Sequence, residues 1–382
     1  MLNNLTEVTS AVPLKALQKL SGKVRAKLRS QRQRLAEQSR LCALSSSVRH
    51  VHGPLSVTTA QTEAVVLCVV KDGESLAQAF IEHYLNLGFK HLYFLDNGST
   101  DRTIEIIRCC QQATIISSDA PFQDYYITFK NFLIQSFGRG KWCLVADIDE
   151  FLFFPLHQTL PNVLSYLNQH RHSTVFIQML DVFSRAGILL SHKENTLSLT
   201  QLRQVFCYYD LNALKKQRPA RLFQPALPAG ANFLYGGIRK TVFNQNCFLT
   251  KEALFFAGKH TKLKSSHLLN RSRVADFSGL FLHYKFTDNF YTSTLHAVQA
   301  ENHWQDSKEY KAYLSVLEKQ AALSPESTAT ESTATLSLFQ PSSRRLNDID
   351  SLIDQGFLFA SERFSSYAAQ TTPIDEQEHA ST

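Results

Sequence analysis

A cluster of acidic residues interrupts an apolar segment near the middle of the sequence. Residues 141–146 have the composition of a buried strand, and they run directly into Asp147, Asp149 and Glu150 before apolar residues resume. Clustered carboxylates at the end of a buried strand are costly, because their charges are desolvated beside one another. A bound Mg²⁺ or Mn²⁺ would offset that repulsion, since hard divalent cations prefer oxygen ligands. The alternative is an exposed acidic turn after the strand.

The acidic cluster follows the fourth strand of a predicted alternation of strands and helices. Apolar runs predict strands at residues 63–70, 91–95, 113–117, 141–147 and 174–180, and helical spacing predicts helices at 75–87, 102–110, 124–137 and 160–169. Such alternation favours an α/β fold, in which right-handed crossovers build a doubly wound, mostly parallel sheet with helices on both faces. The later pattern is weaker, with strand-like runs at 205–209, 241–243 and 280–286 and a predicted helix at 294–320.

Charged residues stand where several of these strands end. Lys71 and Asp72 follow the first strand, Asp96 ends the second, and Asp181 follows the fifth. In open α/β sheets the carboxyl ends of the parallel strands meet at one edge, where ligands bind. We therefore expect these side chains to line the same edge as the acidic cluster.

The sequence divides into a central body and less regular ends. We expect a basic helical extension at 1–50, a linker at 51–62, a globular domain at 63–320, a flexible linker at 321–345 and a C-terminal tail at 346–382. The extension carries ten Lys or Arg and two Glu, a net charge of +8, whereas the remaining 30 basic and 31 acidic residues nearly cancel. A nucleic-acid-binding protein would carry a basic face on its body, so nucleic acid is not an expected partner. The extension could lie on an anionic membrane surface, and a solvated helix or a contact with a partner is the alternative.

Composition also predicts the cellular compartment. The seven cysteines are scattered without a Cys-x-x-Cys pair, which indicates reduced thiols. No stretch approaches the roughly 18 consecutive apolar residues of a spanning helix, and the first residues lack the apolar core of a secretory signal. We expect a cytoplasmic protein, with peripheral contact to the inner face of the plasma membrane through the basic extension as a further prediction.

Several enzyme classes are excluded by missing motifs. The first strand is not followed by G-x-G-x-x-G or G-x-x-x-x-G-K-[ST], which argues against dinucleotide-binding and P-loop enzymes. The sequence has no G-x-S-x-G elbow, which weakens an esterase interpretation. An aspartyl phosphatase would place its acids after the first strand and not the fourth. A nucleotide-diphosphate ligand held by a metal remains.

Three segments, in order, resemble family 2 glycosyltransferases: Val65–Lys71, Phe94–Thr103 and Ala146–Leu152. They are most similar to the bacterial branch whose strand ends in Asp-Ile-Asp-Glu-Phe. Later segments agree with that branch, namely Leu180–Asp181, Gly237–Lys240, Leu249–Lys251, Ser266–His267, Leu280–Phe286 and Glu309–Tyr313. The resemblance covers roughly residues 63–315.

The resemblance implies a GT-A fold with a donor half at about 63–152 and an acceptor half at about 153–320. It implies transfer of a sugar, with inversion at the anomeric carbon, from a nucleotide-diphosphate sugar to a glycan or lipid-linked acceptor in cell-envelope polysaccharide synthesis. Asp149 would bind a divalent metal, Mn²⁺ or Mg²⁺, which stabilises charge on the leaving diphosphate. His283 would be a further contact to the metal or diphosphate, with a polar strand residue as the alternative.

The other implied contacts are to the donor. They are Lys71, Asp72, Asp96, Asp147, Arg239 and His267. Asp96 would contact the base or ribose of the nucleotide, and Asp147 would help to hold the nucleotide-sugar. Arg239 follows two glycines and suits a diphosphate. A capping role is the alternative for Asp72, and a structural role is the alternative for His267.

An inverting transfer also needs a base that deprotonates the acceptor hydroxyl. Asp181 and Glu150 are the candidates, and the residues alone do not separate them. Asp181 is favoured because Glu150 can instead support the loop or the metal. A non-catalytic protein that binds nucleotide-sugars or glycans on the same fold is the alternative function.

Overall fold

The computed structural model describes residues 22–190, 196–219, 227–299, 304–323 and 335–371. The chain separates into two units, Met1–Ser47 and Val48–Thr382. The described part of the first unit is helix α2 (Gly22–Ser47), which carries seven Lys or Arg residues and Glu37. The predicted basic helix is therefore present over these residues, while its contact with a membrane stays a prediction. None of the helices in the described ranges combines the length and the apolar character needed to cross a membrane.

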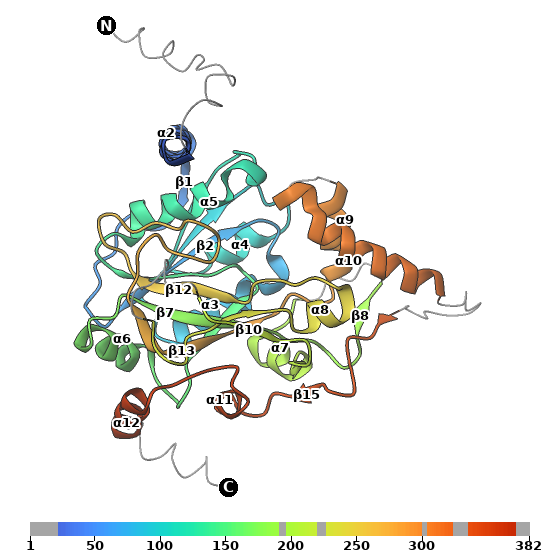
Figure 1. Ribbon diagram of the computed structural model, residues 1–382. Helices are drawn as coiled ribbons and strands as arrows, with labels where there is room; N and C mark the ends of the chain where they lie inside the picture. Colours follow the sequence, from blue (N-terminus) through green and yellow to red (C-terminus); the bar gives the residue numbers. More distant parts are fainter. Residues whose placement is uncertain (1–21, 191–195, 220–226, 300–303, 324–334, 372–382) are drawn as a thin grey trace, which may run out of the picture. The chain divides into compact units, whose positions relative to one another are not determined.

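A nine-stranded sheet forms the centre of the second unit (Figure 1). In chain order its strands are β1 (Arg49–His52), β2 (Ala64–Val70), β3 (His91–Asp96), β4 (Ala113–Ser117), β5 (Trp142–Val145), β6 (Glu150–Phe153), β7 (Thr174–Asp181), β12 (Thr250–Phe256) and β13 (Val274–His283). They lie side by side in the order β1-β4-β3-β2-β5-β12-β7-β13-β6. Strands β2 to β5 are parallel, and β12 is antiparallel to both β5 and β7, so β7 and its parallel neighbour β13 point the same way as β5. The predicted mostly parallel α/β sheet is confirmed.

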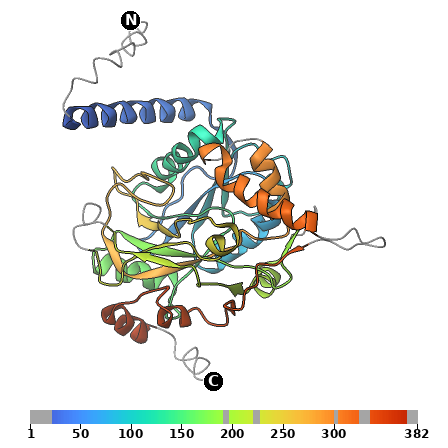
Figure 2. The same cartoon turned by 45° about the vertical axis from the view of Figure 1, so that its right-hand side comes forward.

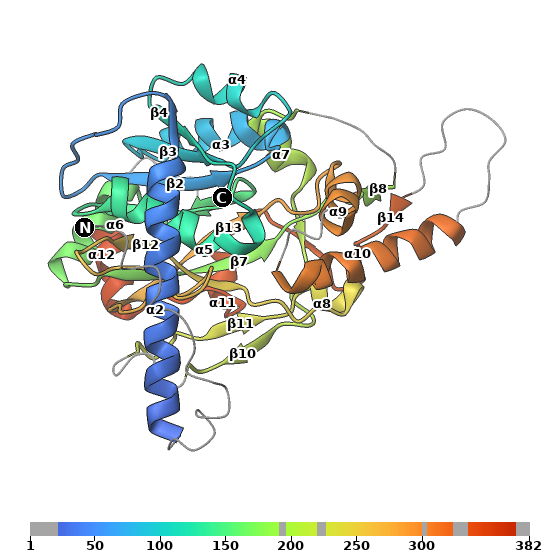
Figure 3. The ribbon, with the colours of Figure 1, turned by 90° about the horizontal axis from the view of Figure 1, so that it is seen from above.

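Helices and short strands connect and cover this sheet. The helices are α3 (Glu74–Asn86), α4 (Thr103–Arg108), α5 (Phe122–Leu133) with its continuation η1 (Ile134–Gly138), α6 (Leu160–Gln169), α7 (Leu199–Val205), α8 (Ile238–Phe243), α9 (Phe290–Gln299), α10 (Trp304–Leu323), α11 (Ser351–Asp354) and α12 (Glu362–Thr371). The short strands are β8 (Ile188–Leu189), β9 (Tyr208–Tyr209), β10 (Lys215–Gln217), β11 (Phe233–Tyr235), β14 (Thr335–Leu336) and β15 (Arg344–Arg345). Figure 3 shows α8, α9 and α10 gathered at one end of this unit, near β8 and β14.

Helices pack on both faces of the sheet, as predicted. Successive residues of a strand point to opposite faces. On β3, Phe94 contacts Phe80 of α3 with ring centroids 6.0 Å apart, whereas Tyr93 stacks on Phe137 of η1 at 4.4 Å. Helix α3 therefore covers one face and the α5–η1 segment covers the other.

Several stretches differ from the predicted elements. The helix predicted at 294–320 is described as two helices, α9 and α10, and residues 300–303 lie outside the described residues. The strand-like run at 241–243 belongs to helix α8, which starts after Gly237 (φ 64°) and ends before Asn244 (φ 56°), so that prediction is wrong. The run at 205–209 divides between the last residue of α7 and strand β9. The acidic cluster connects two strands, β5 and β6, where the sequence indicated only the first.

The predicted linkers contain paired strands. Strand β1 spans the expected boundary between extension and linker, and it pairs antiparallel with β4. Strands β14 and β15 fall within the stretch predicted as a flexible linker, and they pair with β8 and β9. Residues 324–334 of that stretch lie outside the described residues.

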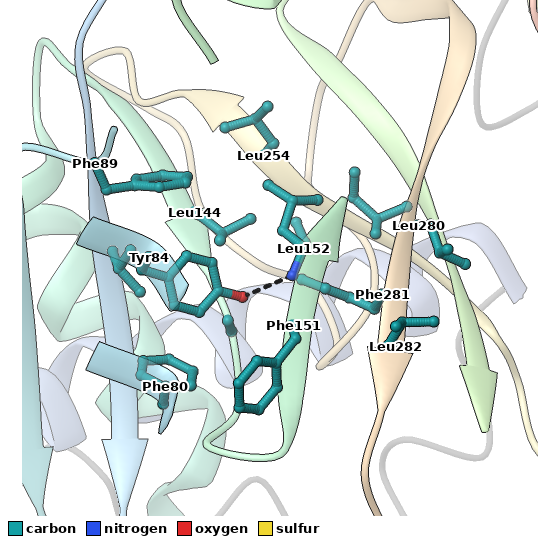
Figure 4. Close-up of a cluster of buried hydrophobic side chains, with 14 of the residues drawn as sticks. Phe80, Tyr84, Phe89, Leu144, Phe151, Leu152, Leu254, Leu280, Phe281 and Leu282 are labelled. Carbon is teal, nitrogen blue, oxygen red and sulfur yellow. Dashed lines mark hydrogen bonds between the residues drawn. The ribbon is translucent and has the colours of Figure 1, made fainter. Parts of the chain in front are cut away.

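Strand β6 lies at the edge of the sheet, where two side chains of α3 bind its backbone. Figure 4 shows one of these contacts, between the Tyr84 hydroxyl and the N–H of Leu152. The hydroxyl of Tyr84 donates to the C=O of Glu150 at 2.6 Å and accepts the N–H of Leu152 at 3.2 Å. His83 Nε2 donates to the C=O of Leu152 at 2.8 Å. These side chains satisfy backbone groups that a further strand would otherwise bind.

Tyr84→Phe is expected to lower the free energy of unfolding by about 1–3 kcal/mol, because the N–H of Leu152 loses its buried partner. Urea denaturation measures the change. Tyr284→Phe is the matched control, since the Tyr284 hydroxyl is buried and has no hydrogen-bond partner among the described residues. Tyr284→Phe is expected to leave the free energy of unfolding almost unchanged. Equal losses in the two variants would contradict the role assigned to the Tyr84 hydroxyl.

The C-terminal segment, residues 335–371, packs against the rest of the second unit (Figure 2). The ring of Phe364 in α12 stacks on Phe277 of β13 with centroids 3.7 Å apart. The carboxylate of Asp276 accepts hydrogen bonds from Ser361 at 2.6 Å, from Arg363 Nη2 at 2.7 Å and from the Tyr166 hydroxyl at 2.9 Å. Over its described residues, the predicted tail is thus part of the folded body.

Asp276→Asn is expected to lower the free energy of unfolding at pH 7 by about 2–4 kcal/mol. Burial alone would raise the pKa of Asp276, but the imidazole of His172 at 3.5 Å and the hydrogen bonds from Ser361 and Arg363 lower it below its ordinary value. A folded-state pKa below the unfolded value of about 3.9 stabilises the fold above that pH, and the contribution is lost as the pH falls further. Denaturation at pH 7 and pH 3 should therefore show a smaller deficit at pH 3. An equal deficit at both values would contradict the electrostatic account.

Candidate active site

The ends of β7 and β13 and the turn between β5 and β6 bring the predicted acids together at one edge of the sheet. Asp181 and His283 are the last residues of β7 and β13, and they stand opposite each other in the strand register. Glu150, the first residue of β6, stands opposite His283 on its other side. The N–H of Glu150 donates to the C=O of Asp147 at 3.0 Å, so the acidic cluster folds as a tight turn. Its side chains therefore reach the same edge as Asp181 and His283.

A line of charged side chains extends from Asp149 across this edge. His283 Nε2 lies 3.1 Å from Asp149 Oδ2, and His283 Nδ1 donates to Asp181 Oδ1 at 2.6 Å. Arg239 Nε donates to the other oxygen of Asp181 at 2.8 Å, and Arg239 Nη1 lies 3.6 Å from Glu309. The imidazole of His283 therefore bridges two carboxylates, and Asp181 is shared between two cations.

These contacts set the protonation states of the line. Burial alone would lower the pKa of His283, but Asp149 and Asp181 raise it to about 9. Burial alone would raise the pKa of Asp181, but Arg239 and His283 lower it to about 2. The pKa of Asp149 is also lowered, because His283 outweighs the effect of burial. At neutral pH the line contains an imidazolium between two carboxylates.

Two buried lysines hold the first acid of the cluster. Lys130 of α5 donates to Asp147 Oδ1 at 2.7 Å, and Lys251 of β12 donates to Asp147 Oδ2 at 3.0 Å. Lys251 also donates to Glu150, whose other oxygen accepts the N–H of Asp147 at 3.1 Å. The lysines are only 5% and 4% exposed, so water screens these ion pairs little. Protein groups thus occupy both carboxylate oxygens of Asp147.

The two carboxylates of this lysine-bound pair respond differently to burial. For Asp147, Lys130 and Lys251 outweigh burial, and the pKa is lowered. For Glu150, burial outweighs Lys251, and the pKa is raised. Asp147 is therefore an ionised partner of two lysines, whereas Glu150 is a stronger proton acceptor than an ordinary carboxylate.

The donor contacts predicted at the first two strands belong to a neighbouring group of loops. Asp96 is buried at the end of β3 and accepts the N–H of Ser99 at 3.1 Å. Asp72 Oδ1 accepts the N–H of Thr100 at 2.7 Å, in agreement with the capping alternative. Lys71 is exposed beside them. All three lie at the carboxyl edge, where Asp72 and Asp96 shape the loop after β3.

His267 lies on the side of the site that contains Lys251. Its Nδ1 donates to the C=O of Thr250 at 3.0 Å, and its ring stacks on Phe248 with centroids 5.0 Å apart. Burial and, secondly, Lys251 lower its pKa to about 3, so the ring is neutral. These contacts are those of a structural histidine, which was the alternative to a donor contact.

Asp149 and His283 have the donor atoms and the separation of two metal ligands. Ligands in neighbouring octahedral positions around Mg²⁺ are roughly 3 Å apart, close to the 3.1 Å between Asp149 Oδ2 and His283 Nε2. Asp181 supplies the carboxylate that commonly orients a metal-binding histidine. In the described part of the chain, no group of three or more His, Cys, Asp or Glu residues could hold a metal alone. The pair therefore fits a metal whose remaining ligands come from water or substrate oxygens.

Four charged residues of this region were not among the predicted site residues. They are Lys130, Lys251, Lys285 and Glu309. Lys130 and Lys251 stand among apolar residues in the sequence, a setting that could have marked them as buried. Lys251 also ends one of the segments that resemble family 2 glycosyltransferases. Lys285 follows His283 by two residues, and its ammonium group lies 4.8 Å from the centroid of the Tyr310 ring.

Comparisons with known proteins bear on the activity of the chain. A search of curated proteins gives no match. Among solved structures, a crystal structure of TarS from S. aureus is similar, with a TM-score of 0.32 and 14% sequence identity, and the match covers 69% of this chain but only 44% of TarS. A likeness this low carries no argument about function. The family model of glycosyltransferase family 92 matches residues 75–317, more than half of the chain. The expected membership of family 2 is not confirmed, and the chain belongs to glycosyltransferase family 92.

Proposed function

We propose that this glycosyltransferase is metal-dependent and transfers a sugar, with inversion, from a nucleotide-diphosphate donor to a glycan or lipid-linked acceptor. The observation that carries the proposal is the arrangement of Asp149, His283 and Asp181. An acid and a histidine stand 3.1 Å apart at the carboxyl edge of the sheet, and a second acid orients the histidine from behind. Few structural roles call for that combination at a ligand-binding edge.

The charges around this arrangement also favour a dianionic ligand together with a divalent cation. Four carboxylates lie at this site, those of Asp147, Asp149, Glu150 and Asp181. Their charges are formally balanced by four cationic groups, namely Lys130, Arg239, Lys251 and protonated His283. A divalent cation bound through His283 would displace the ring proton and leave one net positive charge. A diphosphate carries compensating negative charge, so metal and donor are expected to bind more tightly together than separately.

In this scheme each residue of the line has a distinct task. Asp149 and His283 would hold the metal, which stabilises negative charge on the leaving diphosphate. Asp181 is 5% exposed, and its two oxygens bind His283 and Arg239. We therefore assign Asp181 to the positioning of His283, in place of the base role that the sequence favoured.

Glu150 is the better proton acceptor of the two candidate bases. Its pKa is raised, whereas that of Asp181 is about 2, and a base with a higher pKa takes the acceptor proton more readily. Glu150 is 1% exposed and bound by Lys251. It would meet an acceptor hydroxyl only after that contact opens.

A panel of nucleotide-diphosphate sugars, each with and without Mn²⁺, tests the proposal. At least one donor is expected to raise the melting temperature in the presence of Mn²⁺ and to release nucleoside diphosphate by slow hydrolysis. EDTA should abolish both effects. Donor binding without turnover toward any acceptor would favour the non-catalytic alternative, and turnover that is unaffected by EDTA would overturn metal dependence.

A further inference from the structure

Lys285 is a partly buried cation beside the carboxyl edge of the sheet. Its ammonium group lies 4.8 Å and 5.4 Å from the ring centroids of Tyr310 and Tyr313, and 3.5 Å from the Tyr310 hydroxyl. Among the side chains that the structure describes, no carboxylate lies within 4.0 Å of it. Aromatic faces hold a cation in place without neutralising its charge.

The lysines of the neighbouring pair provide a direct comparison. Lys130 and Lys251 each donate to a carboxylate of the acidic cluster, so their charges are cancelled within the protein. The ammonium group of Lys285 contacts two rings and a hydroxyl. Glu309 acts on it electrostatically, but without an ion pair within 4.0 Å among the described residues. A cation that is largely removed from water and has no directly paired acid can bind an anionic ligand without first breaking an ion pair.

One nitrogen of the Arg239 guanidinium group has no hydrogen-bond acceptor. Its Nε and Nη1 are directed at Asp181 and Glu309, but its Nη2 is buried and has no hydrogen-bond partner among the described residues. The whole side chain is 5% exposed. A guanidinium nitrogen enclosed without an acceptor destabilises the protein, and a phosphate oxygen is a strong acceptor for it.

The two cations and the metal-binding pair share one neighbourhood. Lys285 acts electrostatically on Asp149 and on Arg239. Arg239 and His283 both donate hydrogen bonds to the carboxylate of Asp181. Lys285 also follows His283, the last residue of β13, by two residues. A ligand bound at Asp149 and His283 would therefore meet positive charge on the side formed by Lys285 and Arg239.

We propose that Lys285, together with Nη2 of Arg239, forms an anion subsite that binds the diphosphate of the donor next to Asp149 and His283. The inference rests on the proposed function, and it adds a binding residue that stabilises the leaving group through its fixed charge. Tyr310 and Tyr313 of α10 hold the ammonium group at this position. Helix α10 thereby contributes to donor binding without itself supplying a metal ligand.

Isothermal titration of pyrophosphate in the presence of Mg²⁺ tests the subsite. Lys285→Met is expected to weaken binding about 10- to 100-fold, the effect of losing one charge-assisted hydrogen bond. Lys285→Arg should restore most of the affinity, because it returns the charge. Lys259→Met is the control, since Lys259 is exposed and follows Ala257, which binds the start of β5 at the opposite edge of the sheet. Its affinity should equal that of the wild type.

Three outcomes would overturn the inference. The first is equal pyrophosphate affinity in the wild type and Lys285→Met, or no binding to the wild type. The second is an equal loss of affinity for inorganic phosphate without metal, which would indicate a general anion site. The third is a lower melting temperature of Lys285→Met in the absence of ligand, with an undiminished increase on adding pyrophosphate, which would indicate a purely structural lysine. Hydrolysis of nucleotide-sugars by the wild type in the same series would show that the proposed function stands even if the subsite fails.

Discussion

Asp149→Asn is expected to reduce the rate of sugar transfer roughly 1,000-fold while leaving the protein folded. The asparagine has nearly the same shape and can still accept a hydrogen bond from His283, so the turn between β5 and β6 should persist. Asparagine lacks the negative charge that attracts a divalent cation. Without the metal, the leaving group loses several kcal/mol of stabilisation, which corresponds to a rate decrease of roughly 1,000-fold. Initial rates with saturating donor, measured across a Mn²⁺ titration, give the result.

The control for this substitution is Asp119→Asn. Asp119 is an exposed acid that pairs with Arg49 on the surface, and its removal changes the net charge by the same amount. It should leave both the rate and the Mn²⁺ dependence unchanged. A rate for Asp149→Asn within a few-fold of the wild type, with the same response to Mn²⁺, would place the metal elsewhere and overturn the assignment.

Lys251→Met is expected to lower the free energy of unfolding by about 3–5 kcal/mol. Removing one member of a buried ion pair leaves the other charges without compensation, and in this protein Asp147 and Glu150 both lose a partner. Methionine has similar volume, so little of the loss would come from a cavity. Guanidinium denaturation at pH 7 measures the change.

The deficit of Lys251→Met should depend on pH. Without Lys251, the already raised pKa of Glu150 is expected to rise further, so the folded variant binds a proton more readily than the unfolded chain. Stability then falls as the pH increases. The loss relative to the wild type is therefore expected to be larger at pH 8 than at pH 5. The opposite order would exclude Glu150 as the group left uncompensated.

Two further variants separate the effect of burying the lysine from the effect of its ion pair on the free energy of unfolding. Lys90→Met removes an exposed lysine that pairs with Glu63, and it should cost no more than about 1 kcal/mol. The double variant Lys251→Met with Glu150→Gln removes both charges of one pair, and it should be more stable than Lys251→Met alone. A double variant with the sum of the two single losses would show that the pair is not coupled.

The sequence predicted the parts of the fold that depend on local pattern. Strand β2 is a continuous apolar run, and Leu76, Phe80 and Tyr84 recur at helical spacing in α3, so their elements and order follow from periodicity. The position of the acids at the carboxyl edge follows in turn from strand–helix alternation. Strand β6 could not be predicted, because one acid and three apolar residues after a turn give no indication of which sheet edge they join.

The pairings within the site depend on contacts between distant residues. His283 was predicted next to the metal site, and its nitrogen indeed lies close to Asp149. The contact between His283 and Asp181 arises from the register of two strands about 100 residues apart, which no local pattern encodes. Asp181, which was predicted as the base, therefore has both carboxylate oxygens bound by Arg239 and His283. Lysines usually lie at the surface, and the sequence analysis made no prediction that Lys130 and Lys251 are buried in the site.

The short connection between β5 and β6 constrains the sheet itself. Three strands separate β5 from β6 in the sheet, a distance of about 19 Å if the strands lay flat. A tight turn of this length reaches less than about 15 Å. The sheet must therefore curl so that β6 approaches α3, where Tyr84 binds it. Because the connection is short and contacts within the protein hold Asp147 and Asp149, we expect binding at Asp149 to require little loss of conformational entropy.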